Sequence, residues 1–140
     1  MSYPTEQTLF FSSPEFAVVG ASTVKEKYGT RVLKWYIDRN KTVTPVHPKE
    51  EVLEGINTVK TLSELPHPAS TSVSIVTPPK VTLRLLEEGK KLGIPAFWLQ
   101  PGAEDDAVRQ YIEEGGLSSK VVLGGPCVLV DGDGVTRSLL

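Results

Sequence analysis

Five short apolar runs, each rich in β-branched residues, recur along this chain and limit its fold more than any other feature. The runs are nearly continuous rather than alternating, which is typical of strands buried on both faces of a parallel sheet. Successive runs begin about 25 to 29 residues apart, so each gap has room for a crossover helix. We therefore predict strands at Phe16–Gly20, Thr42–Val46, Thr71–Val76, Ala96–Leu99 and Val121–Leu123.

Helical patterns occupy three of the gaps. An apolar stripe predicts a helix from Tyr28 to about Arg39, a second helix spans Pro79–Leu92, and Asp105–Asp106 favour the start of a third that ends at Gly115–Gly116. Leu62–Leu65 suggests only a short helical turn. Strands that alternate with helices predict an α/β fold: a Rossmann-like, doubly wound, mostly parallel five-stranded sheet with helices on both faces.

The C-terminal segment carries a different signal. Two short apolar stretches, Val128–Val130 and Val135–Arg137, flank the sequence Asp131-Gly132-Asp133-Gly134. Asp-Gly pairs between apolar stretches are typical of tight turns. We therefore expect an extra C-terminal edge strand or a terminal hairpin.

Length and charge exclude several classes of protein. At 140 residues the chain fits one domain, which we expect to span residues 1–140. A net charge of −2 leaves no basic surplus to attract nucleic acid. No apolar run approaches the roughly 20 residues that span a bilayer, and the segment before Phe16 has no Lys or Arg, unlike a signal peptide or presequence. We expect a cytoplasmic protein without a nucleic-acid or membrane partner; a homo-oligomer or a protein partner stays open.

The loops that follow the strands are the places to look for a site. In an open parallel sheet, ligands bind outside the carboxyl ends of the strands, where helix N-termini offer free N–H groups. Five uncommon tripeptides stand at these positions: Gly20-Ala21-Ser22, His47-Pro48-Lys49, Thr77-Pro78-Pro79, Gln100-Pro101-Gly102 and Gly125-Pro126-Cys127.

The first tripeptide has the context of a phosphate-binding turn, although the full G-x-G-x-x-G fingerprint is missing. Gly20 would let a pyrophosphate approach the backbone, Ser22 could donate a hydroxyl, and Lys25 or Lys27 would add charge. The alternative is an ordinary strand–helix turn with a capping serine. If the turn binds phosphate, Gly20→Val should block binding while leaving the protein folded.

The end of the second strand separates classes of cofactor. An NAD site has a carboxylate there to hold the ribose hydroxyls, whereas this chain has His47, Pro48 and Lys49. A cation suits a phosphorylated ribose, as in the 3′-phosphate of coenzyme A (CoA) or the 2′-phosphate of NADP. The alternative is that Lys49 simply begins a solvated charge run with Glu50 and Glu51.

The next two loops offer a wall for a ligand rather than catalytic groups. Thr77, Pro78 and Pro79 form a rigid surface suited to an adenine or a pantetheine arm, although proline also simply starts helices. Trp98 is expected in the core, which leaves Gln100 free to contact the ligand.

Catalytic candidates are few. His67 lies in a proline-flanked loop, and Cys127, the only cysteine, is either a nucleophile with a lowered pKa or a buried packing residue. No spacing typical of a metal site and no Ser/His/acid set is present in the sequence. The sequence therefore favours a binding protein over an enzyme.

These loops resemble those of a known family, the standalone CoA-binding proteins. That family is related to the CoA-binding N-terminal domain of the succinyl-CoA synthetase alpha subunit and of ADP-forming acyl-CoA synthetases. The resemblance spans nearly the whole chain and depends on ordered motifs at Phe16–Ser22, Lys27–Gly29, Pro45–Lys49, Thr77–Pro79, Trp98–Gly102 and Gly125–Cys127.

The resemblance implies roles for particular residues. The first strand-end turn and Lys27 would contact the phosphates, Val46, Pro48 and Lys49 would hold the adenosine end, and the threonine–proline segment would line the remaining wall. His47 departs from the family, whose small members usually have Asn in an Asn-Pro-Lys triplet. The predicted ligand-binding residues are Gly20, Ala21, Ser22, Lys27, Tyr28, Val46, His47, Pro48, Lys49, Thr77, Pro78, Pro79 and Gln100.

Three functions are compatible with this sequence. The first is a binding or regulatory module for CoA or an acyl-CoA; the phosphorylated histidine of the synthetases belongs to a following domain, so ligase activity is not implied. The second is an NADP-dependent oxidoreductase or NADP-binding protein, which the cationic second strand end would also suit. The third is an interaction protein with a vestigial nucleotide pocket. Fold alone does not separate them.

Overall fold

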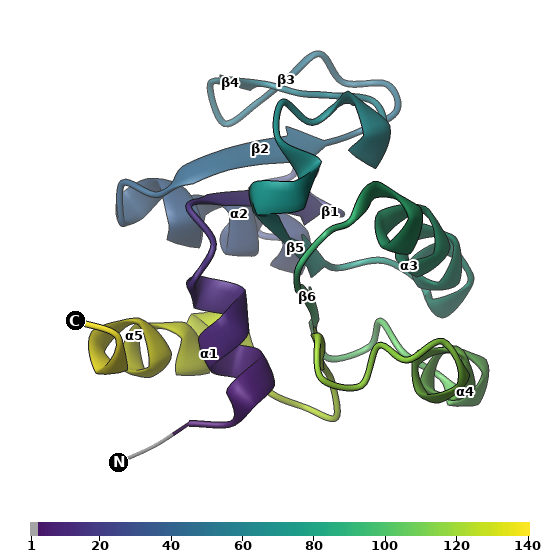
Figure 1. The fold of residues 1–140 in the computed structure, drawn as a ribbon. Helices are drawn as coiled ribbons and strands as arrows, with labels where there is room; N and C mark the ends of the chain where they lie inside the picture. The colour runs from purple at the N-terminus through teal and green to yellow at the C-terminus, as the bar shows by residue number, and fades with distance from the viewer. Residues whose placement is uncertain (1–2) are drawn as a thin grey trace.

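Five parallel strands form the central sheet of the computed structural model, which describes residues 3–140 (Figure 1). Each predicted strand is confirmed to within one residue at either end. Their order across the sheet is β2-β1-β5-β6-β7, so β2 lies on one side of β1 and the later strands follow one another on the other side. The strands are β1 Glu15–Val19, β2 Thr42–Val46, β5 Thr71–Ile75, β6 Phe97–Leu99 and β7 Val121–Val122.

Helices cover both faces of this sheet, as predicted. One face packs against α1 (Thr5–Phe11), α2 (Tyr28–Asp38) and α5 (Val128–Ser138). The other packs against α3 (Pro79–Leu92) and α4 (Asp106–Glu114), and α1 and α5 lie on the opposite side of the sheet from them in Figure 1. The predicted helices α2, α3 and α4 are confirmed.

The remaining elements are short. The predicted turn of helix near Leu62–Leu65 is a 3-10 helix over Leu62–Glu64, and a second one spans Pro68–Ser70. Two additional strands, β3 (Val52–Leu53) and β4 (Ile56–Asn57), pair with each other in an antiparallel hairpin that follows β2.

The alternation of side chains along the strands divides the core into two layers. Phe16 and Val18 of β1 point to the face covered by α2, while Ala17 and Val19 point to the face covered by α3. All four residues are buried, which explains why the sequence reads as a continuous apolar run. Trp98 is fully buried in the first layer, so its predicted place in the core is confirmed.

The helix α1 has no clear sequence signal and depends on tertiary contacts. It has seven residues, fewer than an isolated helix needs to be stable in water. Phe10 packs edge-on against Trp98 with ring centroids 5.5 Å apart, and Phe11 lies 5.7 Å from Phe16. The Ser72 hydroxyl also donates to the Phe10 carbonyl oxygen at 2.7 Å. Burial of this aromatic pair keeps α1 on the sheet.

The predicted C-terminal hairpin or edge strand is wrong, because the segment forms helix α5. Gly132 and Gly134 lie inside the helix rather than in a turn. A Cβ on Gly132 would come within 2.5 Å of the Trp35 ring, so the glycine allows α5 to approach α2 closely. Arg39, which follows the last residue of α2, donates to both carboxylate oxygens of Asp133, at 2.6 and 2.8 Å. Helix-to-helix packing thus overrides the local turn signal.

Among residues 3–140, no helix is both long enough and apolar enough to cross a membrane.

Candidate functional site

The carboxyl ends of β1 and β5 lie side by side in the sheet. This is the point where the strand order reverses, because β2 is on one side of β1 and all later strands are on the other. Loops that leave neighbouring strands toward opposite faces open a crevice at such a point, and ligands of doubly wound folds bind there. The segments that border it are Gly20–Ser22 after β1 and Val76–Pro78 after β5.

Gly20 makes the turn after β1 sterically possible. Its φ is +119°, a conformation that favours glycine, and a Cβ there would lie 2.7 Å from the Val76 carbonyl carbon and closer still to the oxygen. Gly29 in the first turn of α2 repeats the arrangement, because its Cβ would lie 2.6 Å from the Gly20 carbonyl carbon. The turn is therefore held between β5 and α2 with no room for side chains.

This packing corrects the expectation that Gly20→Val would leave the protein folded. The clash is with the backbone of Val76, the residue after β5, whose N–H donates to the Val19 carbonyl oxygen at 2.8 Å and so continues the pairing of β5 with β1. A valine would also have to adopt a positive φ. The substitution would disrupt the fold as well as the turn, so it does not isolate ligand binding.

Ser22 is fastened to α2 through Thr30. The Ser22 N–H donates to the Thr30 hydroxyl oxygen at 3.1 Å, and that hydroxyl donates to the Ser22 carbonyl oxygen at 3.0 Å. Ser22 Oγ accepts from the Val24 N–H, while Thr30 is completely buried. Ala21 is also buried. The Ser22 side chain remains half-buried at the start of the loop, where an anion would meet the N-terminus of α2.

At the end of β2, the histidine side chain builds the turn itself. His47 Nδ1 accepts from the Lys49 N–H at 3.0 Å and from the Glu50 N–H at 2.9 Å. An asparagine side-chain oxygen commonly accepts backbone N–H groups in this way in turns. The departure from the Asn-Pro-Lys pattern therefore keeps the geometry of the turn while changing the chemistry of the acceptor.

Two cationic side chains lie in loops at the carboxyl end of the sheet. Lys27 and Lys49 are exposed, and neither has an ion-pair partner within residues 3–140. Lys25 is instead paired with Glu54 of the β3–β4 hairpin at 2.9 Å. Of the other residues predicted after β2, Pro48 is exposed, but Val46 is 5% exposed and belongs to the core.

A pocket of about 310 Å³ lies between the loops that follow β5 and β6. Its volume is near the lower end of the roughly 300–1,000 Å³ typical of small-molecule sites. Thr77, half-buried at the wall, shares a hydrogen bond with Thr82 at 2.8 Å, and Pro78 is exposed. Pro79 begins α3. The lining residues are Val76, Thr77, Pro78, Pro101, Gly102 and Ala103.

Gln100 is not free at the surface, contrary to the sequence-based expectation. The residue is 0% exposed, and its Oε1 accepts from the Tyr28 hydroxyl and from the Val128 N–H, both at 3.1 Å. Its Nε2 has no partner within residues 3–140. Gln100 therefore ties β6 to the first turns of α2 and α5, directly beside Pro101 of the pocket.

The same cluster includes Cys127, for which the sequence allowed two roles, a nucleophile or a buried packing residue. Cys127 is half-buried, and its Sγ lies 2.7 Å from the Tyr28 hydroxyl. Burial, followed by the hydrogen bond to Cys127, raises the pKa of Tyr28 well above its usual value, so its hydroxyl keeps its proton. Tyr28 was predicted as a ligand-binding residue, but no sequence signal places it against this thiol.

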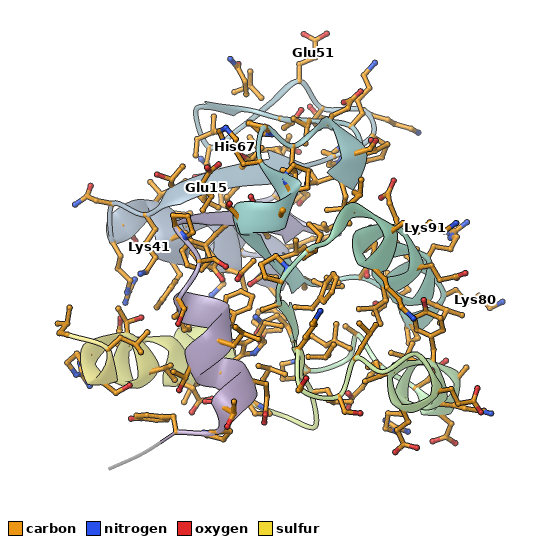
Figure 2. All side chains as sticks on the ribbon, viewed as in Figure 1. Glu15, Lys41, Glu51, His67, Lys80 and Lys91 are labelled. Carbon is orange, nitrogen blue, oxygen red and sulfur yellow. The ribbon has the colours of Figure 1, made fainter. Side chains whose placement is uncertain are left out.

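His67 lies at the amino end of the sheet, away from the loops described above. It stands just before β5 and contacts Glu15, the first residue of β1, at 2.8 Å, and the two side chains face each other in Figure 2. Both residues therefore lie at the amino end of the sheet, opposite the crevice. Within the part of the chain that the structure describes, no three His, Cys, Asp or Glu side chains gather in an arrangement that could hold a metal ion.

Comparisons with known proteins match both the sequence and the fold of this chain. The model of a family described as a CoA binding domain matches residues 14–133. A conserved hypothetical protein from Pyrococcus furiosus is 33% identical, with a TM-score of 0.76 over 84% of this chain and 97% of that protein. The comparison with curated proteins gives no match.

Two further solved structures share the fold. A hypothetical protein from Pyrococcus horikoshii OT3 is 22% identical, with a TM-score of 0.80 over 96% of this chain and 97% of that one. The dinucleotide forming acetyl-coenzyme A synthetase 1 of Ca. Korarchaeum cryptofilum is 21% identical, with a TM-score of 0.67 over 80% of this chain and 25% of the synthetase. Most of this chain thus corresponds to about a quarter of that larger enzyme.

Proposed function

We propose that this chain, which belongs to the CoA binding domain family, binds coenzyme A or an acyl-CoA at the carboxyl edge of its sheet. The observation that carries the proposal is the match of the family model over residues 14–133, which includes the loops after all five parallel strands. The crevice between β1 and β5 is the place that this sheet topology offers for a nucleotide.

The turn after β1 suits the pyrophosphate. Gly20 is exposed, and the first N–H groups of α2 have no partner within the helix, so an anion can bind them at this turn. Ser22 and the exposed Lys27 add a hydroxyl and a charge at the same place. The close packing of Gly20 against Val76 and Gly29 keeps this turn in one conformation, which reduces the entropy lost on binding.

The turn after β2 suits the adenosine end with its 3′-phosphate. His47 holds the backbone of this turn, and Lys49 is exposed without an ion-pair partner in residues 3–140, so its charge is available to a phosphate. Val46, which is buried, would act by supporting the turn rather than by touching the ligand.

The pocket between the β5 and β6 loops suits the less polar pantetheine arm or an acyl group. Pro78 and Pro101 line it without N–H donors, and Thr77 supplies one hydroxyl. A pocket of about 310 Å³ is too small for a whole CoA molecule, so the ligand would lie along the crevice with only one part in the pocket.

Calorimetry with CoA, acetyl-CoA, NADP and NAD tests the proposal. We expect binding of CoA or acetyl-CoA and a rise in melting temperature at saturating ligand. Binding of NADP without binding of CoA would replace the proposal with a nicotinamide-nucleotide function. If none of the four ligands binds, the pocket is vestigial and the protein is an interaction partner.

A substitution of Lys49 tests the position of the 3′-phosphate. Lys49→Ala should weaken CoA binding by about 1 kcal/mol, or roughly fivefold, since the side chain is exposed and its charge is partly screened. Binding of dephospho-CoA should be unchanged, because that ligand lacks the 3′-phosphate. Lys91→Ala is the matched control: it removes the same charge from the last turn of α3, where the side chain projects into solvent (Figure 2). Equal weakening of both ligands would contradict the role of Lys49.

A further inference from the structure

Three residues that are far apart in the sequence meet at a thiol near the proposed ligand crevice. Tyr28 begins α2, Gln100 follows β6, and Cys127 precedes α5. The Tyr28 hydroxyl lies 3.1 Å from Gln100 Oε1 and 2.7 Å from Cys127 Sγ, contacts that span 72 and 99 residues of sequence. The Cys127 N–H donates to Asp131 Oδ2 at 2.9 Å, which fixes the backbone at the thiol.

The hydrogen bonds of this cluster allow a thiolate. The Tyr28 hydroxyl has one proton, and burial raises the pKa of Tyr28 so that this proton is kept. It can be donated either to Gln100 Oε1 or to Cys127 Sγ. If Cys127 loses its proton, the Tyr28 hydroxyl can turn to the sulfur, while Gln100 Oε1 still accepts from the Val128 N–H. The attacking sulfur would thus keep one hydrogen bond, donated by the Tyr28 hydroxyl.

An unsatisfied donor in the same cluster points to a ligand. Gln100 is completely buried, and its Nε2 has no hydrogen-bond partner within residues 3–140. The opposite orientation of the amide is excluded, because Nε2 would then face the Val128 N–H, donor against donor. A buried donor without an acceptor is costly, and folded proteins have few of them. A carbonyl oxygen brought by a ligand would satisfy it.

The cluster adjoins, along the chain, one of the loops that line the pocket. Gln100 directly precedes Pro101, which lines the pocket together with Gly102 and Ala103. Cys127 is half-buried and follows the loop Gly124–Pro126 at the carboxyl end of β7. The thiol therefore lies at the same edge of the sheet as the place proposed for the pantetheine arm.

We infer that Cys127 accepts the acyl group of a bound acyl-CoA; this inference rests on the proposed function. The Cys127 thiolate attacks the thioester carbonyl carbon, a new sulfur–carbon bond forms, and the bond between that carbon and the CoA sulfur breaks. CoA leaves as a thiolate and takes up the proton that Cys127 released to solvent. The products are an S-acyl Cys127 and free CoA, and the exchange of one thioester for another needs no oxidant.

The unpaired Gln100 donor favours acyl transfer over disulfide exchange. Attack on a thioester develops negative charge on the carbonyl oxygen, and amide N–H groups stabilise such an oxyanion. Attack on a disulfide develops no oxyanion, so an amide donor would not stabilise it. Gln100 Nε2 is the donor of this cluster that has no partner within residues 3–140, so it is the group that would serve in that way.

Mass spectrometry of the intact protein after incubation with acetyl-CoA tests the inference. We expect one acetyl group per chain, removed by neutral hydroxylamine as thioesters are, and no adduct on Cys127→Ala. Acetylated lysines resist hydroxylamine and would not be confused with it. A hydroxylamine-sensitive adduct of equal yield on Cys127→Ala would overturn the inference.

A second variant tests the hydroxyl without removing the thiol. Tyr28→Phe should slow acetylation at saturating acetyl-CoA by at least about tenfold, the lower end of what losing a hydrogen bond to a charged group causes. Tyr111→Phe is the matched control: it removes the same hydroxyl from α4, on the other face of the sheet, and should acetylate at the wild-type rate. Equal rates for Tyr28→Phe and Tyr111→Phe would contradict the role of the cluster.

The outcomes for binding and for acylation are separate. If calorimetry shows that the wild-type protein binds acetyl-CoA but no thioester forms, the inference fails and the proposed function stands. If the only adduct is a disulfide with CoA that a reductant removes, Cys127 is not an acyl acceptor and the inference also fails. If neither CoA nor acetyl-CoA binds, the proposed function fails and the inference fails with it.

Discussion

Gly29→Ala is a substitution for which two physical effects oppose each other. Gly29 is the second residue of α2, and alanine favours helix over glycine by about 1 kcal/mol. Helix propensity alone therefore predicts that the variant is more stable than the wild type. The packing at this position predicts the reverse.

The steric cost comes from backbone rather than from a flexible side chain. A Cβ on Gly29 would lie 2.6 Å from the Gly20 carbonyl carbon, closer to its oxygen, and 3.0 Å from the Ala21 nitrogen. Gly20 is itself held against Val76 of the β5 end, so the turn cannot yield without moving the sheet. Overpacking of this kind costs typically 1–3 kcal/mol and more when nothing can relax. We expect a net loss of about 1–2 kcal/mol in the free energy of unfolding.

Urea denaturation, followed by tryptophan fluorescence, measures this difference. Arg84→Ala and Arg84→Gly, at an exposed position in the middle of α3, give the alanine–glycine difference of this protein without the clash. The same displacement of the Gly20 turn should weaken CoA binding in Gly29→Ala beyond its effect on stability. A variant that is more stable than the wild type, by the amount the Arg84 pair measures, would refute the steric argument.

Two further substitutions test the β2 turn and the core. His47→Asn should keep both the fold and CoA affinity, because its side-chain oxygen can accept the Lys49 and Glu50 N–H groups, whereas His47→Ala should cost about 1 kcal/mol of unfolding free energy in urea. Tyr36→Phe should cost about 1–2 kcal/mol at neutral pH, because it leaves the buried Ser74 hydroxyl without its 2.6 Å partner. Burial raises the pKa of Tyr36, so above about pH 10 the unfolded chain loses the tyrosine proton while the folded chain keeps it. The free energy of unfolding of the wild type should therefore fall by about 1 kcal/mol per pH unit in that range, and that of Tyr36→Phe should fall less steeply. Parallel curves for the two proteins would contradict the raised pKa of Tyr36.

Local sequence patterns predicted most of the secondary structure because they report local physics. Continuous apolar runs mark strands buried on both faces, and the stripe on α2 follows from the helical repeat. The same patterns failed at the ends of the chain. The seven residues of α1 are helical only because Phe10 and Phe11 are buried on the sheet, and Gly132 serves helix packing against Trp35 although Asp-Gly pairs normally mark turns.

The sequence by itself determined where the loops proposed to bind the ligand lie, because a motif that follows a parallel strand is placed at the carboxyl end of the sheet whatever the strand order. Gly20, the β2 turn and the Thr77–Pro79 wall follow from that rule. Only the tertiary structure decided which side chains meet there. It buried Gln100, made the His47 ring a hydrogen-bond acceptor within its own turn, and brought Tyr28 against Cys127, 99 residues away in the sequence. Strand order and helix packing create these contacts, and neither is encoded in the spacing of any one segment.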